Sequence, residues 1–344
     1  MRALAIVALA LLLAGCGRPV PAGTTELLFA SPYGPGHPFS KADRTWMKFV
    51  EERSGGRLKV RTNWSGGLIS SDESMTELRH GVADIGLVTP IYVKGGAHLL
   101  RIQTGFYTGA RTIEDQVALY RCMEAAEPEF GRELEGLHVL AVQGGVLPGI
   151  ITRERAIRSL DDLKGLRIRA PTELLTVLRA LGADPVNMPM GDVYPALAKG
   201  VIDGVVAPPD TFQSLHFAEV ARYFVAIDIP RGAYPSRAIG ERRWLALSEA
   251  DRQVLTESAR VWEAALAEEN RKAVEVGRQA AIKAGVVFTR IGAADQLRFD
   301  RAYNRGAENS VGHLLRYGID GRRAFQIARS SVGPQGVRCS EGKP

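Results

Sequence analysis

The sequence predicts an α/β protein with two lobes, and three observations support this fold class. Short apolar stretches alternate with amphipathic stretches along most of the chain, which is the pattern of parallel strands joined by crossover helices. The length of 344 residues suits two domains of ordinary size. A helical pattern over 248–283 corresponds to a helix roughly 50 Å long, so we expect one helix to lie across both lobes and join them.

The first residues have the composition of a secretory signal. An apolar run over 3–13 leads into Leu13-Ala-Gly-Cys16, in which small residues precede a cysteine whose thiol can be acylated after cleavage. We therefore expect a lipoprotein signal peptide at 1–15, lipidation of Cys16 and a tether at 16–25. The apolar run is too short to span a bilayer as a finished helix, and no later run reaches ~18 apolar residues. The expected protein is exported, periplasmic and lipid-anchored, and an uncleaved anchor would also leave most of the chain outside the cytoplasm.

The expected first lobe begins with a strand, helix, strand, helix, strand pattern. Apolar or alternating residues predict the strands, and side chains at helical spacing, such as Trp46, Phe49 and Val50, predict the helices. The expected strands are 26–30, 57–62, 84–89, 138–142 and 236–240, and the expected helices are 39–53, 73–81 and 112–127. We assign residues 26–145 and 235–275 to this lobe.

The expected second lobe continues the alternation. Its expected strands are 149–153, 166–170, 186–189, 203–206, 223–227 and 286–290, and its expected helices are 172–181, 192–199, 210–217 and 293–317. The long helix starts at a capping box, Ser248-Glu-Ala-Asp251, and Gly285 ends it. We assign residues 146–234 and 276–330 to the second lobe and 331–344 to a tail.

A short motif around Arg169 is the first candidate for ligand binding. Ser159 and Asp162 can cap a helical turn, Gly165 can end it, and residues 166–170 then form a strand. Arg169 lies near the carboxyl end of this strand, where α/β sheets bind ligands, and its planar guanidinium matches a carboxylate. We expect Arg169 to anchor an organic anion. A structural ion pair or an exposed charge at the strand end is the alternative reading of these residues.

The charge and the cysteines limit the possible partners and chemistry. The formal net charge is +6, and the positive residues are scattered rather than gathered in a basic stripe, so a nucleic-acid groove is not indicated. Besides Cys16, the exported chain has Cys122 and Cys339. A disulfide between them and two free thiols both fit the sequence. Without a Cys-x-x-Cys motif, a redox or zinc site has no support.

The motifs of common enzyme classes are absent from the sequence. There is no Gly-x-Ser-x-Gly elbow, no P-loop and no complete dinucleotide-binding glycine motif. None of the six histidines occurs at metal-ligand spacing: His37, His80, His98, His138, His216 and His313. We therefore expect no catalytic site, no bound metal and no cofactor.

Several segments occur in a combination that points to one family. They are Gly36-His-Pro38, residues 49–58, the 162–169 motif, and residues 190–204 with Tyr194, Leu197, Gly200, Asp203 and Gly204. Together they resemble the substrate-binding proteins of TRAP transporters, the DctP type, over about residues 26–330. The resemblance implies a fold like that of type II periplasmic binding proteins, with two α/β lobes that close on a ligand. It also implies that Arg169 binds the carboxylate of a small organic acid, which the protein delivers to TRAP membrane permease subunits.

The sequence departs from the family pattern at two polar positions. Where many members have a second arginine this chain has Leu147, and where many have an asparagine it has Ala207. Both differences remove polar contacts, so we expect a less polar monocarboxylate, such as an aromatic or branched acid. The other residues expected to line the ligand cleft are Tyr33, His37, Thr89, Phe106, Phe212 and Tyr234.

Two other functions are compatible with the sequence. An exported lipoprotein could sense the same acid and present it to a receptor instead of a permease. A periplasmic enzyme that reuses the fold is the second alternative, although the absence of enzyme motifs does not favour it. No acidic cluster in the sequence requires a cation between the protein and its ligand.

Overall fold

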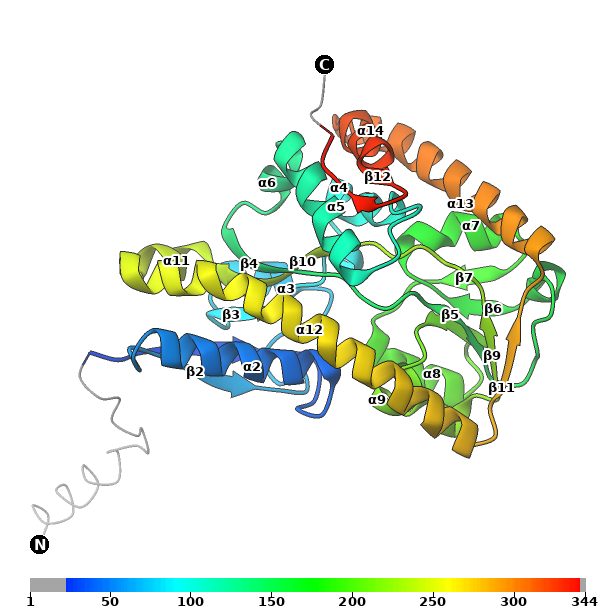
Figure 1. Ribbon diagram of the computed structural model, residues 1–344, viewed down its shortest axis with the longest axis horizontal. Coiled ribbons are helices and arrows are strands. Elements are labelled where there is room, and N and C mark those ends of the chain that lie inside the picture. The colour runs from blue at the N-terminus through cyan, green and yellow to red at the C-terminus, as the bar shows by residue number, and fades with distance from the viewer. Residues whose placement is uncertain (1–22, 341–344) are drawn as a thin grey trace, which may run out of the picture.

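The computed structural model describes residues 23–340, so the expected signal peptide, Cys16 and most of the tether lie outside the described residues. Within this range the chain forms two large mixed sheets with helices packed around them (Figure 1). We call the parts built on these sheets the first lobe and the second lobe. The α/β class and the two-lobed architecture expected from the sequence are confirmed.

The first lobe contains a five-stranded sheet in the order β2-β1-β3-β10-β4. Its strands are β1 (Thr25–Ala30), β2 (Leu58–Asn63), β3 (Ile85–Leu87), β4 (Leu137–Gln143) and β10 (Tyr234–Gly240). β1 pairs in parallel with β2 and β3, whereas β10 is antiparallel to both of its neighbours. The helical segments of this part of the chain are α2 (Pro38–Arg53), α3 (Ser74–Arg79), η1 (Pro90–Tyr92), α4 (His98–Ile102), η2 (Gln103–Gly105), α5 (Ile113–Ala126), α6 (Glu129–Glu133) and α11 (Glu241–Ala246).

The second lobe contains a six-stranded sheet in the order β11-β9-β5-β8-β6-β7. Its strands are β5 (Gly149–Thr152), β6 (Arg167–Arg169), β7 (Asp184–Val186), β8 (Gly204–Ala207), β9 (Tyr223–Ala226) and β11 (Val287–Arg290). β6 is parallel to both β7 and β8. The helical segments are η3 (Leu160–Leu163), η4 (Thr172–Leu174), α7 (Leu175–Ala180), η5 (Met190–Asp192), α8 (Val193–Ala198), α9 (Thr211–Ser214) and α10 (Phe217–Val220).

The turn before β6 forms as the sequence predicts. Ser159 and Asp162 make a capping box at η3, in which Ser159 N donates a hydrogen bond to Asp162 Oδ2 at 2.9 Å. Asp203, the residue before β8, contacts β6: its Oδ2 accepts a hydrogen bond from Arg167 N at 2.7 Å. Gly204 is required beside it, since a Cβ there would lie 2.6 Å from Ile151 O. The bond between Asp203 and Arg167 and the pairing of β6 with β8 fix the position of the strand that carries Arg169.

Two strand connections and a long helix join the lobes. The chain crosses from β4 to β5, returns from β9 to β10, and crosses again along α12 (Glu249–Lys283). α12 runs obliquely over both lobes (Figure 1) and packs against α2 in the first lobe and α9 in the second. Ser248 caps the helix, with its Oγ accepting a hydrogen bond from Asp251 N at 3.2 Å. The expected lobe-spanning helix is present.

The C-terminal helices differ from the predicted division of the chain. α13 (Ala293–Leu314), which continues into η6 (Leu315–Tyr317), packs through Phe299 and Tyr303 in the second-lobe core but through Val311 and Leu314 in the first-lobe core. α14 (Arg322–Ser331), which the sequence analysis does not predict, packs against α5. The assignment of 276–330 to the second lobe is therefore wrong for its last part. An amphipathic pattern reveals an apolar face, but not which core receives that face.

The tail is fixed to the first lobe. Cys122 on α5 forms a disulfide with Cys339, and the two Cα atoms are 5.1 Å apart. A short hairpin of β12 (Val332–Gly333) and β13 (Gly336–Val337) precedes Cys339, and Val337 N donates a hydrogen bond to Asp115 Oδ1 on α5 at 3.1 Å. Of the two alternatives that the sequence leaves open, the structure therefore contains the disulfide.

Candidate functional site

A cavity with a volume of about 100 Å³ lies between the two lobes. Its walls come from the carboxyl ends of parallel strands in both sheets. Tyr33 follows β1 and Tyr92 follows β3 in the first lobe, while Arg169 ends β6 and Asp210 follows β8 in the second lobe. Open α/β sheets bind ligands at this edge, so the cavity is the candidate ligand site.

Arg169 is buried in this cavity, with 2% of its surface exposed. Its Nε donates a hydrogen bond to Met188 O at 3.0 Å, and its Nη2 donates to Tyr92 Oη at 2.6 Å. It has no ion-pair partner within the described part of the chain. Arg167, on the same strand, pairs instead with Asp184 at the surface, at 3.0 Å. The Arg169 guanidinium is therefore a buried positive charge without a counter-ion among residues 23–340.

Contacts across the cavity hold the lobes together. The hydrogen bond between Arg169 and Tyr92 joins the second lobe to the first, and Thr172 Oγ1 donates to Ile91 O at 3.2 Å. A Cβ on Gly105 would lie only 3.3 Å from Glu173 Cβ, so the two lobes also meet there. The lobes are thus closed over the cavity. Tyr92 could not be predicted from the sequence, because a single aromatic residue in one short helical turn has no spacing that marks it.

Arg231 is a second guanidinium in the cavity, and the sequence analysis also missed it. It lies in the connection from β9 to β10, where no hydrophobic period exists to place a side chain. Its Nη1 donates to Val146 O at 3.1 Å, and a Cβ on Gly145 would lie 2.6 Å from its Nη2. Arg231 therefore lies against the same connection that contains Leu147. The cavity therefore contains a guanidinium from a segment other than the one that contains Leu147.

Two carboxyl groups face the same cavity. Burial raises the pKa of Asp210 to about 6, although the charge of Arg231 opposes this rise. Burial also raises the pKa of Glu173, against an interaction with the Thr104 hydroxyl and the charges of Arg169 and Arg231. Glu173 Oε2 is buried without a hydrogen-bond partner among the described residues. The cavity therefore combines two cationic groups with two acids that resist ionisation.

Three of the aromatic or histidine residues expected in the cleft line the cavity: Tyr33, His37 and Tyr234. Burial lowers the pKa of His37 to about 3, with a contribution from Arg237, so this imidazole is neutral at physiological pH. Its Nδ1 accepts a hydrogen bond from Phe39 N at 3.2 Å, and its ring stacks on Tyr33 at 4.1 Å between centroids. Burial raises the pKa of Tyr33 and raises that of Tyr234 to about 12. All three side chains are uncharged at physiological pH and form part of the cavity wall.

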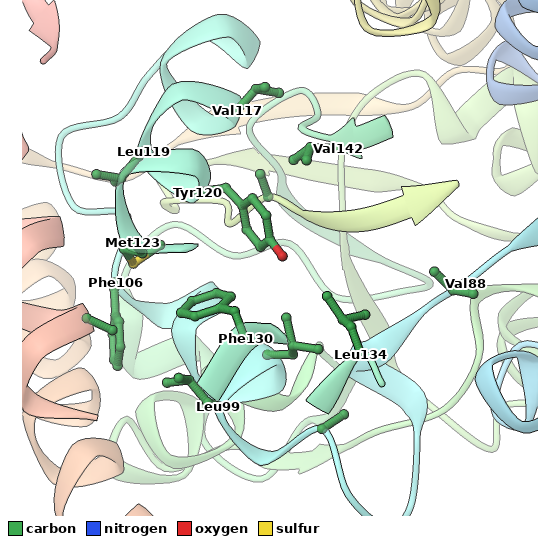
Figure 2. Close-up of a cluster of buried hydrophobic side chains, with 14 of the residues drawn as sticks. Val88, Leu99, Phe106, Val117, Leu119, Tyr120, Met123, Phe130, Leu134 and Val142 are labelled. Atoms are coloured by element: carbon green, nitrogen blue, oxygen red, sulfur yellow. The ribbon is translucent and has the colours of Figure 1, made fainter. Parts of the chain in front are cut away.

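The other three expected cleft residues do not line the cavity. Figure 2 shows Phe106 among the buried side chains of the first lobe, and its ring meets Phe325 at 5.0 Å between centroids. Phe212 belongs to a core cluster of the second lobe. Thr89 is buried and is close in sequence to the cavity residues Ile91 and Tyr92, but it does not line the cavity. Position after a strand predicts that a residue is near the sheet edge, but not to which side its side chain turns.

The long helix also contributes to the cavity wall. Asn270 on α12 is 3% exposed and lines the cavity, and its Nδ2 has no hydrogen-bond partner within residues 23–340. About two turns later, Gly277 lets α12 approach the segment at Asp210. A Cβ on Gly277 would lie 2.7 Å from Asp210 Cα. The helix that joins the lobes is therefore also part of the site. Sequence periodicity could not identify Asn270 as a cavity residue, because core-facing and cavity-facing positions of a helix look alike.

The sequence matches a known family over most of its length. Residues 29–310 match the DctP family, described as bacterial extracellular solute-binding protein, family 7. The chain is a DctP-family solute-binding protein. The family and the similar proteins are extracytoplasmic solute receptors rather than enzymes. The expected family is therefore confirmed.

Relatives and solved structures agree with this assignment. A solute-binding protein of Chromohalobacter salexigens is 26% identical to this DctP-family chain over 264 residues, which cover 71% of this chain and 75% of the relative. A TRAP solute-binding protein from Rhodoferax ferrireducens, solved in complex with copurified benzoate, matches with a TM-score of 0.81 at 25% identity, covering 89% of this chain and 97% of that one. A TRAP periplasmic solute-binding protein from Bordetella bronchiseptica, with bound mandelate, shares the fold with a TM-score of 0.78 at 20% identity over 90% and 98% of the two chains.

Two kinds of feature are absent from the described residues. Across residues 23–340, no cluster of three or more His, Cys, Asp and Glu side chains is arranged to hold a metal ion. In the same range, no helix combines the length and the apolar composition that a membrane crossing requires.

Proposed function

We propose that this DctP-family protein is an exported lipoprotein that captures a small organic carboxylate on Arg169 and delivers it to a TRAP-type permease. The observation that carries the proposal is the Arg169 guanidinium, which is buried between the lobes and has no counter-ion within the described residues. A carboxylate is the natural ligand for such a group, because arginine offers it two parallel N–H donors.

The energetics favour an anion in this cavity. An unpaired buried guanidinium is costly, so a carboxylate both forms a charge-assisted pair and relieves the unpaired charge. A hydrogen bond to a charged group contributes on the order of 1.5–3 kcal/mol, so tight binding needs further contacts. Arg231 and Asn270 supply donors within the same cavity.

The size of the cavity indicates a compact acid. An engineered protein cavity of about 150 Å³ binds benzene, and the present cavity measures about 100 Å³ in the closed state. Two of the similar solved receptors contain benzoate or mandelate, which are compact aromatic acids. Because the present volume is smaller than one that holds benzene, we infer a compact acid, and an aromatic acid would need the lobes to close slightly less tightly around it.

Delivery requires that the ligand control the closure of the lobes. The walls of the cavity come from both lobes, so a ligand touches all of them only in the closed state and selects that state. A membrane partner can then distinguish the loaded receptor from the empty one by its shape. The lipid on Cys16 would hold the receptor at the membrane where the permease lies.

The carboxylate proposal is tested by a thermal-shift screen of matched acids and amides, such as benzoate with benzamide and phenylacetate with phenylacetamide. A ligand that binds only the folded state raises the apparent Tm. We expect at least one acid to raise the Tm of the mature protein while its neutral amide does not. Equal shifts with acid and amide, or no shift with any acid, would contradict the proposal.

The lipid anchor is tested by Cys16→Ser in the full-length chain. We expect the wild-type protein in the membrane fraction with a mass increase on its N-terminal cysteine, and the variant without the acyl mass. The matched control is the double variant Cys122→Ser with Cys339→Ser, which removes the disulfide of the folded lobe and leaves Cys16 in place. Membrane association and mass that do not change in the Cys16 variant would refute lipidation at this residue.

A further inference from the structure

Glu173 presents an unused hydrogen-bond acceptor in the ligand cavity. Its Oε2 is buried and has no partner among residues 23–340. Glu173 lies on the turn η4, shortly after Arg169, so one short segment brings both groups to the cavity. Leaving a buried polar atom unpaired is costly. An unpaired atom in a ligand cavity therefore indicates a contact that the ligand supplies.

A carboxylate alone cannot supply this contact. An ionised carboxylate offers only acceptors, and these match the donors of the cavity, namely the guanidiniums of Arg169 and Arg231 and the unpaired Nδ2 of Asn270. Glu173 Oε2 needs a donor instead. If Glu173 is ionised it would also repel a second carboxylate. If Oε2 carries no proton, the group of the cargo that faces Glu173 must be a donor.

We propose that Glu173 selects the cargo by accepting a hydrogen bond from a hydroxyl group, so that the protein carries a small hydroxycarboxylate. This inference rests on the proposed carboxylate function and adds a second point of recognition to it. Arg169 binds the carboxylate end of the cargo, and Glu173 binds a hydroxyl group on the same molecule. The short distance in sequence between the two residues suits a compact ligand, in agreement with the cavity volume of about 100 Å³.

A hydroxyl group fits this position better than an ammonium group. The guanidiniums of Arg169 and Arg231 face the same cavity and repel a third cation. Burial raises the pKa of Glu173, which favours its neutral form. A hydroxyl group can donate to an unprotonated Oε2 whether or not the carboxyl group is charged.

A competing role for Glu173 makes a different prediction. A protonated Glu173 could donate its own proton to the carboxylate of the cargo. A hydroxyl group on the cargo would then be irrelevant, and removal of Glu173 would weaken the binding of hydroxylated and unsubstituted acids equally. Matched pairs of acids therefore separate the two roles.

The experiment is isothermal titration calorimetry on the mature protein with three matched pairs: mandelate and phenylacetate, 3-hydroxybenzoate and benzoate, and lactate and propionate. In at least one pair we expect the hydroxylated acid to bind about tenfold tighter or more, which is the size of one hydrogen bond to a charged or buried group. In Glu173→Leu this preference should disappear while the affinity for the unsubstituted acid is kept. Glu173→Gln retains an acceptor and should keep most of the preference. Glu154→Leu is the control, since the Glu154 side chain is 74% exposed.

The outcomes separate the failure of this inference from the failure of the carboxylate function. Equal affinities within every pair, or an equal loss for both members in Glu173→Leu, would refute the role of Glu173 while leaving the carboxylate function intact. Tighter binding of the amino analogues phenylglycine, 3-aminobenzoate or alanine would refute a hydroxyl group as the selected donor. If none of the acids binds the wild-type protein, the carboxylate function fails and the role of Glu173 fails with it.

Discussion

At the scale of single residues, the ionisation of Asp210 offers a direct test of the cavity electrostatics. Burial raises the pKa of Asp210 from its ordinary value of 3.8 to about 6. Between these two values the folded protein holds a proton that the unfolded chain has released, so the free energy of unfolding falls as pH rises through this window. The difference amounts to on the order of 3 kcal/mol.

We therefore expect Asp210→Asn to stabilise the ligand-free protein at pH 8 but not near pH 4, because asparagine has no charge to desolvate. Denaturant unfolding at both pH values measures the change. Asp192→Asn serves as the control, since Asp192 is exposed in the same lobe. A stability difference between wild type and Asp210→Asn that is the same at pH 4 and pH 8 would show that Asp210 is not a desolvated acid.

Single residues were also the hardest part of the site to foresee. Arg169 could be predicted because a capping box, a glycine and a strand fix its position at the end of β6. Arg231, Tyr92 and Glu173 lie in loops or short turns, where no period tells which way a side chain points. Phe106, after a turn, and Phe212, in a short helix after β8, were expected in the cleft, but both pack in cores. Only the tertiary fold decides between these outcomes.

At the scale of elements, the close approach of α12 to the Asp210 segment depends on Gly277. Glycine in a helix interior costs about 1 kcal/mol relative to alanine, so Gly277→Ala would stabilise an isolated helix. In the folded protein, however, the new Cβ would lie 2.7 Å from Asp210 Cα and nearer still to Pro209 O. We expect Gly277→Ala to lower the free energy of unfolding by about 1–3 kcal/mol, as measured by chemical denaturation.

Val276→Ala is the matched control for this prediction. Val276 is the preceding residue of α12 and is 54% exposed, so this change alters helix propensity without a new contact. We expect it to be neutral or slightly stabilising. If Gly277→Ala were as stable as Val276→Ala, the packing of α12 on the 209–210 segment would not require glycine.

The elements themselves were largely predictable from the sequence. Strands such as β1 and helices such as α2 have clear hydrophobic periods, and α12 begins at the predicted capping box. The short helices α4 and α6 were missed because one turn of helix has too few residues to show a period. α14 was missed because the segment follows the last clear helical pattern, although its apolar face packs on α5.

At the scale of the whole molecule, Tyr92 forms part of the closed state. Its hydroxyl oxygen accepts a hydrogen bond from Arg169 Nη2 across the cavity at 2.6 Å. Tyr92→Phe removes this contact, so we expect the closed state to be less favourable and carboxylate affinity to fall about tenfold. Calorimetry measures the affinity, and small-angle X-ray scattering measures the compaction of the protein at saturating acid.

Tyr194→Phe is the control for the Tyr92 variant. The Tyr194 hydroxyl donates to Glu219 Oε2 at 2.7 Å within the second lobe, away from the cavity lining. We expect this variant to bind and compact like the wild type. An unchanged affinity in Tyr92→Phe would mean that the contact between Tyr92 and Arg169 does not contribute to closure.

The division of the chain between the lobes could be predicted only in part. Both strand crossings and the long helix follow from the order of the elements. The return of α13 and α14 to the first lobe does not, because it depends on which core has an open apolar face. The disulfide between Cys122 and Cys339 also ties this C-terminal part of the chain to the first lobe. The spacing of the cysteines along the sequence could not establish that they are paired.

The most direct test of the account compares Arg169→Ala with Arg167→Ala. The two residues lie on the same strand, but Arg169 is buried in the cavity, whereas Arg167 pairs with Asp184 at the surface. Calorimetry with the tightest carboxylate from the acid screen, on variants shown to be folded by circular dichroism, gives the affinities. We predict that Arg169→Ala loses at least about 30-fold in affinity and that Arg167→Ala binds like the wild type. Wild-type affinity in the folded Arg169→Ala variant would contradict the account.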